Sequence, residues 1–266
     1  MYEQALNYLI DPALWVQDNF RVVLDDWQVS ALRSSSKQSL WNIHRQSGKS
    51  TVAAWKALHM AIYREKSLIL MVSPSERQSS ELFRKFDGAY DLLEAPPERV
   101  EDKALSCTLS NGSRVVALPG IEDTIRSYSS VSLIVEDEAS RVPDDLYVAI
   151  RPMLAISQGS ILLMSTPNGK LGHFFKTWDD NVDPETFQAR PGSAWEAVRI
   201  QADQCKRISK AWLDNERLNM IDQKYRQEFM CEFCDIEGAV FDSDLFRSLI
   251  DPNLKAMSFK DFDGGD

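Results

Sequence analysis

Cysteine is scarce in this chain of 266 residues. The four cysteines are Cys107, Cys205, Cys231 and Cys234, and only the last two lie close together. A single C-x-x-C without a second pair is a weak pattern for zinc, and we expect it to lie in a helix where both thiols pack. This cysteine usage fits a reducing cytoplasm.

Long apolar runs are also missing. No stretch approaches the roughly 20 apolar residues that a membrane-spanning helix needs, and the N-terminus shows no signal-peptide pattern. The apolar content of 44% is nevertheless enough for a sizeable core. A chain of this length has room for one large α/β domain and a small appendage. We therefore expect a protein with no membrane partner.

Positive charge is in deficit. There are 30 Lys and Arg against 40 Asp and Glu, so the formal net charge is −10 and the pI is near 4.9. A stand-alone protein that coats DNA phosphates should be basic, which argues against that class. A motor that grips DNA briefly through a few residues stays open, with weak and salt-sensitive binding by this chain alone. Two basic clusters could serve, or could be ordinary solvated charge: Arg77, Arg84 and Lys85, and Lys206, Arg207 and Lys210.

Residues 41–51 contain the most informative motif. A short apolar strand leads into a polar turn that ends in Gly48-Lys49-Ser50, and a helix is predicted from Val52 to about Tyr63. This is the layout of a phosphate-binding loop, in which the lysine reaches the β- and γ-phosphates and the serine hydroxyl completes a Mg²⁺ shell. The helix would point its positive N-terminal end at the anion. Ile43 stands where the usual first glycine lies, so the loop alone could also be a surface turn.

Two later apolar runs end in polar residues. Residues 131–139 predict a buried strand with acids at its tip, where P-loop ATPases hold Mg²⁺ and orient the attacking water. We assign Asp137 to the metal and Glu138 to the water, with Glu136 as the rival unless its side chain turns away. Residues 160–167 predict another buried strand, which ends in hydroxyls before a Pro-Asn-Gly turn. The three segments in this order favour a nucleotide site over ordinary core.

Alternating strands and helices predict an α/β fold with a mainly parallel central sheet flanked by helices. Together with the loop and the acid-tipped strand, this indicates the P-loop NTPase (ASCE) type. Residues 1–180 would form this ATPase core, opening with a helical segment. Asn111-Gly112 predicts a hairpin between residues 105–109 and 114–118. The composition changes at Asn181, so we expect a small subdomain at 181–245, with strand and helix content, and a polar tail at 246–266.

Seven short motifs carry a resemblance to a known family. They are residues 26–28 (DWQ), 45–50 (RQSGKS), 125–128 (IRSY), 137–140 (DEAS), 151–154 (RPML), 165–169 (STPNG) and 225–229 (YRQEF). Together they resemble the ATPase portion of the large terminase of tailed bacteriophages, the motor that packages viral DNA. The resemblance runs from about residue 24 to 235. Large terminases commonly deviate at the first glycine of the loop, which accounts for Ile43.

The resemblance implies a site for ATP and Mg²⁺. It implies that Gln28 reads the adenine edge, that Arg45 contacts the phosphates, and that Arg126 is offered to the ATP of a neighbouring subunit, although Arg126 could instead form a structural ion pair. Ser165 and Thr166 resemble the coupling motif that senses γ-phosphate loss, or else a helix-capping turn. The expected ATP-binding residues are Trp27, Gln28, Arg45, Gln46, Ser47, Gly48, Lys49, Ser50 and Thr51; Trp27 could also be plain core.

The resemblance also implies partners. These are double-stranded DNA, the portal protein, the small terminase subunit, and further copies of the chain in a ring, with five copies on the portal and weak association or a monomer in solution. The protein would work in the host cytoplasm, docked transiently on the procapsid and absent from the mature virion. Residues 181–245 would be the lid subdomain. Too few residues follow the lid for the C-terminal nuclease domain of large terminases, so we expect no nuclease activity in this chain.

Two other functions compete with a DNA translocase. A helicase-like remodelling ATPase with a comparable acidic tip normally has two ATPase lobes, and about 97 residues after Gly169 are too few for a second. A non-catalytic nucleotide-binding scaffold would not need Glu138 to orient a water.

Overall fold

The computed structural model describes residues 2–119 and 128–235. Contacts between Cα atoms group the chain up to Cys234 into one compact unit. Within the described part of the chain, no helix is long and apolar enough to cross a membrane.

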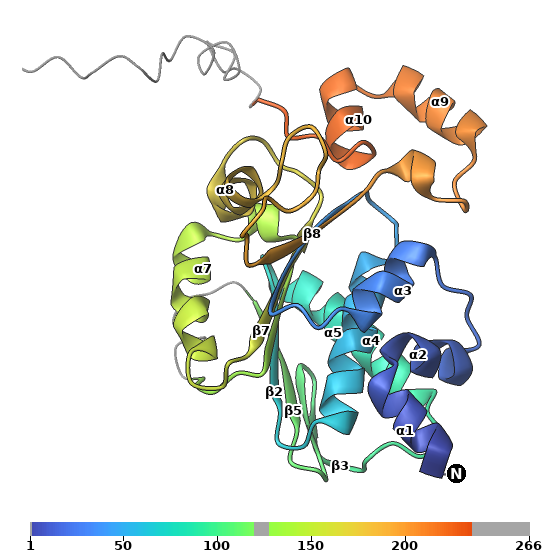
Figure 1. The fold of residues 1–266 in the computed structure, drawn as a ribbon, viewed down its shortest axis with the longest axis vertical. Coiled ribbons are helices and arrows are strands. Elements are labelled where there is room, and N and C mark those ends of the chain that lie inside the picture. Colours follow the sequence, from blue (N-terminus) through green and yellow to red (C-terminus); the bar gives the residue numbers. More distant parts are fainter. Residues whose placement is uncertain (1, 120–127, 236–266) are drawn as a thin grey trace, which may run out of the picture. The chain divides into compact units, whose positions relative to one another are not determined.

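One mixed sheet organises the protein (Figure 1). In the described residues it has eight strands in the order β3-β4-β5-β2-β6-β7-β1-β8. All neighbours from β5 to β8 are parallel, whereas β3, β4 and β5 pair antiparallel. The strands are β1 (Gln38–Ile43), β2 (Leu68–Ser73), β3 (Arg99–Lys103), β4 (Ser106–Leu109), β5 (Arg114–Pro119), β6 (Leu133–Asp137), β7 (Ser160–Ser165) and β8 (Trp195–Ile200). The mainly parallel α/β fold and the hairpin are confirmed, and β3 is an additional edge strand.

Helices cover both faces of the sheet (Figure 1). One face carries α1 (Tyr2–Ile10), α2 (Pro12–Phe20), α3 (Asp26–Arg33), α4 (Lys49–Tyr63) and α5 (Glu76–Asp91), and the other carries α7 (Asp144–Ile150) and α8 (Gly172–Asn181). Each face has its own apolar core, with Trp41 and Phe86 in the first and Leu163 and Phe174 in the second. Because β2, β6 and β7 are covered on both sides, their sequences are mainly apolar runs.

The C-terminal part of the described chain adds a small layer of helices. α9 (Lys210–Asn219) and α10 (Asp222–Glu228) pack around Leu213, Tyr225 and Phe229. β8 precedes them and is an edge strand of the central sheet, paired with β1. The separate small core therefore begins after residue 200, and the exact boundary between core and lid stays a prediction.

The C-x-x-C segment differs from the expectation. α10 ends at Glu228, and Cys231 has a left-handed backbone with φ 54°. Two side chains from the sheet donate hydrogen bonds to backbone carbonyls of this segment. Arg199 donates to the Met230 carbonyl, and Asn42 donates to the Cys231 carbonyl. Both cysteines are buried free thiols, and within the described residues no group of three metal-ligating side chains is present. Both thiols are thus buried as expected, but they lie outside a helix.

Candidate functional site

The phosphate-binding loop lies between β1 and α4. Gln46 and Gly48 have φ of 62° and 91°, so the chain turns through two left-handed residues that flank Ser47. Ile43 is fully buried as the last residue of β1, paired with Ile200. A glycine is not needed at this position because the backbone there is still an ordinary strand. The start of α4 at Lys49 places the N–H groups of a helix end beside the loop.

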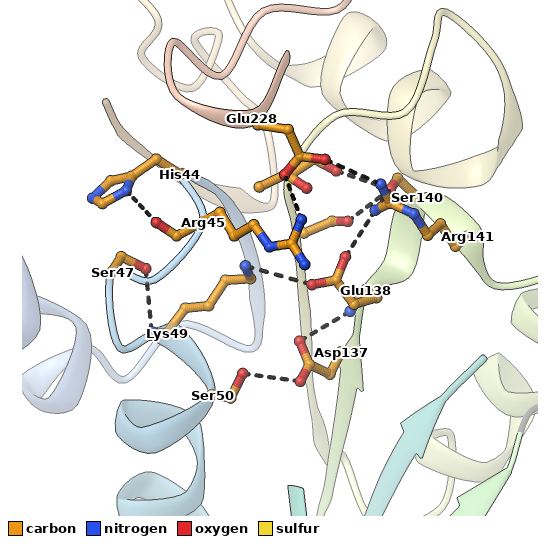
Figure 2. Close-up of polar contacts among 12 residues, drawn as sticks. His44, Arg45, Ser47, Lys49, Ser50, Asp137, Glu138, Ser140, Arg141 and Glu228 are labelled. Carbon is orange, nitrogen blue, oxygen red and sulfur yellow. Dashed lines mark hydrogen bonds and ion pairs between the residues drawn. The ribbon is translucent and has the colours of Figure 1, made fainter. Parts of the chain in front are cut away.

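The acids at the tip of β6 meet this loop (Figure 2). The Ser50 hydroxyl donates to Asp137 Oδ2 at 3.0 Å, and Lys49 Nζ lies 3.6 Å from Glu138 Oε1. Asp137 is buried, and this burial raises its pKa. Glu138 has φ 53°, and its N–H donates to Asp137 Oδ1. The structure therefore brings together the four residues that the sequence assigned to phosphate, metal and water.

Glu136 faces away from this cluster. Successive side chains of a strand point to opposite faces of the sheet. Glu136 is fully buried, and its Oε1 lies 2.5 Å from His173 Nε2 at the start of α8. His173 also contacts Asp144 through its backbone N–H at 2.7 Å and its Nδ1 at 3.1 Å. The geometry favours Glu138 over Glu136 as the acid beside the loop.

Stability should depend on pH through His173. Burial alone would lower its pKa, but the hydrogen bonds and charges of Glu136 and Asp144 outweigh burial and leave the pKa above the ordinary 6.5. A raised folded-state pKa contributes stability that is present below 6.5 and is lost as pH rises through the folded value. We expect His173→Gln to lower the free energy of unfolding more at pH 6 than at pH 8.

Urea unfolding at both pH values measures this difference. The comparison must be between variant and wild type, because burial lowers the pKa of His44 and His59 and gives them the opposite pH dependence. An equal loss at both pH values would show that folding does not shift the pKa of His173.

Two charged residues that sequence reasoning missed complete the cluster (Figure 2). Arg141 Nη1 lies 2.8 Å from Glu138 Oε2, and its Nη2 lies 3.6 Å from Glu228 Oε1 at the end of α10. Arg45 Nη1 lies 3.9 Å from Glu228 Oε2, and the Arg45 backbone N–H donates to the Glu228 carbonyl at 3.0 Å. Glu228 belongs to the motif at residues 225–229, which was a signal for a role at the site.

The hydroxyl residues at the end of β7 contact the turn after Glu138. Ser165 Oγ lies 2.7 Å from Ser140 Oγ, and Ser140 Oγ donates to the Thr166 carbonyl at 2.8 Å. All three residues are buried. The proposed coupling residues are therefore linked to the segment that holds Glu138 and Arg141.

The two residues expected on the adenine side, Trp27 and Gln28, lie on α3. Trp27 is half-buried and packs edge-to-face on Trp41 with ring centroids 6.1 Å apart, as a core residue would. Gln28 is 5% exposed, and its Oε1 accepts the Asp25 N–H at 3.0 Å. Gln28 Nε2 would lie 3.4 Å from a Cβ built on Gly48, so this amide is next to the loop. Nucleotide binding by Trp27 and Gln28 stays a prediction, and Arg126 lies outside the described residues.

The fold and this site define a P-loop NTPase of the α/β class. Residues 42–248 match the family model described as terminase large subunit, T4likevirus-type, N-terminal. The chain thus belongs to the terminase large subunit family.

Similar proteins agree with this assignment. The large terminase subunit of Thermus virus P23-45 is 23% identical over an alignment of 252 residues that covers 80% of this chain and 49% of that protein. The chain thus spans about half the length of the curated relatives it matches. The large terminase ATPase domain of Thermus phage P74-26 has the same fold, with a TM-score of 0.71 at 21% identity over 84% of this chain and 99% of that one. The large terminase of another thermophilic bacteriophage, solved in complex with ADP, is similar too, with a TM-score of 0.63 at 12% identity over 79% and 54%.

Proposed function

We propose that this chain binds and hydrolyses ATP with Mg²⁺, and that hydrolysis drives double-stranded DNA into a viral procapsid. One observation carries the ATPase part: Lys49 and Ser50 of the loop lie 3.6 Å and 3.0 Å from Glu138 and Asp137 of β6. Family membership and the ADP-bound relative support it. A scaffold would not need this pairing of a loop lysine with a second acid.

Each residue of the site has a part in this chemistry. Ser50 and Asp137 supply the hard oxygen donors that Mg²⁺ prefers, and a bound Mg²⁺ would neutralise phosphate charge. Lys49 and the loop amides hold the phosphates. Glu138 orients the attacking water, and Arg45 offsets negative charge on the phosphates. Gln28 recognises the adenine edge, and Ser165 and Thr166 pass the change at the γ-phosphate to the turn that contains Ser140.

The translocation part of the proposal rests on family membership. The partners would be double-stranded DNA, the portal protein, the small terminase subunit and other copies of this chain in a ring. The protein would act in the host cytoplasm while docked on the procapsid. The acidic balance of the chain suits a motor that touches DNA briefly rather than one that coats it.

Lys49→Ala should weaken nucleotide binding at least about tenfold, or about 1.4 kcal/mol. Lys49 is 6% exposed, so its ammonium group is already largely removed from water beside the loop. Isothermal titration with Mg-ADP measures the affinity. Lys176→Ala is a matched control, because Lys176 is exposed on α8 and pairs only locally with Asp180. Unchanged ADP affinity in Lys49→Ala would contradict the proposed site.

A further inference from the structure

Arg207 joins three segments at the edge of the nucleotide site. It lies in the short segment that leads into α9, the first helix of the small helical layer. Its Nη2 donates to the Ser47 carbonyl of the phosphate-binding loop at 2.9 Å and to Asp25 Oδ2 at 2.9 Å. Asp25 is the N-cap residue of α3. A single guanidinium thus ties the loop, the helix that carries Gln28 and the segment leading into α9.

The Ser47 carbonyl belongs to a strained part of the phosphate-binding loop. It lies between Gln46 and Gly48, which both have positive φ. The left-handed region is unfavourable for a non-glycine residue such as Gln46, so neighbouring contacts must hold the backbone there. The loop amides must face an incoming phosphate. A charged donor on the Ser47 carbonyl fixes this peptide, because hydrogen bonds from a charged donor are stronger than neutral ones.

The second contact acts on the adenine side. The Asp25 N–H donates to Gln28 Oε1 at 3.0 Å, and Gln28 Nε2 faces Gly48. By holding the Asp25 carboxylate, Arg207 fixes the end of α3 from which Gln28 projects. The same side chain therefore sets both the phosphate end and the adenine end of the site.

The neighbouring lysines lack such contacts. Lys210 is exposed and pairs with Asp214 one turn along α9, and Lys206 is exposed as well. The sequence grouped Lys206, Arg207 and Lys210 as one basic cluster, but the structure separates Arg207 from the other two. Its partners are groups of the nucleotide site rather than solvent alone.

We propose that Arg207 is a positioning residue for the nucleotide: from the C-terminal side it locks the phosphate-binding loop and the Gln28 helix in the geometry that accepts ATP. The inference rests on the proposed ATPase function. It makes nucleotide affinity depend on the placement of the segment before α9. Arg207 does not touch the reacting atoms, so its loss should act on binding more than on the chemical step.

The test compares Arg207→Ala with Lys206→Ala, the exposed neighbour. We expect Arg207→Ala to weaken Mg-ADP binding about tenfold and to raise KM for ATP similarly, while kcat at saturating ATP changes less than about twofold. Lys206→Ala should leave the ADP affinity unchanged. Because Arg207 is 56% exposed, the variant should fold, and thermal unfolding of both variants checks this.

A double-mutant cycle separates positioning from mere loss of charge. Asp25→Asn keeps an N-cap residue but removes the carboxylate that pairs with Arg207. If the two residues act together, Arg207→Ala combined with Asp25→Asn should cost less than the sum of the single changes. Additive losses would contradict the part of the proposal that runs through Asp25.

The remaining outcomes distinguish this inference from the proposed function. Unchanged ADP affinity in Arg207→Ala, with loss in Lys49→Ala, would overturn the inference and leave the ATPase site standing. A wild-type protein that fails to bind Mg-ADP would overturn both. A short duplex DNA serves as the second probe, and weaker DNA binding by Arg207→Ala at unchanged ADP affinity would show that Arg207 is a DNA contact instead.

Discussion

Glu138→Gln should reduce ATP turnover at least about 100-fold while leaving ATP affinity nearly unchanged, because positioned acid–base groups typically contribute 10²–10⁴-fold. Glu138 lies beside Lys49 and Arg141 at 3.6 Å and 2.8 Å, within the cluster that also holds Asp137. Glutamine has the same shape but cannot accept a proton from water. Steady-state phosphate release measures turnover, and titration with ATPγS measures binding.

Glu136→Gln is the matched control. It changes the adjacent acid in the same way, yet Glu136 lies on the other face of β6 against His173. We expect it to keep turnover within about threefold, since no polar atom of Glu136 reaches Lys49 or Ser50 and typical catalytic losses are far larger. If Glu138→Gln turned over normally and Glu136→Gln did not, the assignment of the water-orienting acid would be wrong.

The parts of the site that sequence predicts are those with local signals. Gly48-Lys49-Ser50 lies where a strand gives way to a helix, and Asp137 and Glu138 follow an apolar run at once. Because parallel strands end at one edge of the sheet, these residues had to come together once the strand order placed β1 and β6 near each other. The order itself, with β7 between β1 and β6, follows from packing of the whole sheet.

The contacts that sequence could not supply join distant segments. Arg141 reaches Glu228, and Arg207 reaches Asp25 and Ser47. The position of an arginine in the sequence does not predict which carboxylate or carbonyl its long, flexible side chain will contact. The sequence also wrongly predicted a helix at Cys231 and Cys234. The carbonyls of Met230 and Cys231 accept hydrogen bonds from Arg199 and Asn42 of the sheet instead of continuing α10. Tertiary contacts override local preference at such points.

Three cations beside the phosphate-binding loop, Lys49, Arg45 and Arg141, are already paired within the described chain. Lys49 and Arg141 contact Glu138, and Arg141 and Arg45 contact Glu228. Arg45 is 69% exposed on its side chain and lies at the outer end of this network. A neighbouring subunit that brought one more guanidinium would therefore add charge stabilisation that the single chain provides only in part. The resemblance to large terminases assigns this contribution to Arg126.

Arg126→Ala should lower assembly-dependent turnover by a factor on the order of 10³, as expected for a guanidinium that acts on the transition state. Turnover per wild-type subunit should rise with protein concentration, and the variant should lose this rise while keeping the ATP affinity of the monomer. Mixing Arg126→Ala with Glu138→Ala should restore part of the activity, because one variant keeps an intact site and the other an intact arginine. Phosphate release across mixing ratios measures the recovery, with light scattering to verify that each protein assembles. A mixture that stays inactive although both variants assemble, or an Arg126→Ala protein that hydrolyses ATP like the wild type, would contradict the trans-acting role and favour a structural ion pair for Arg126.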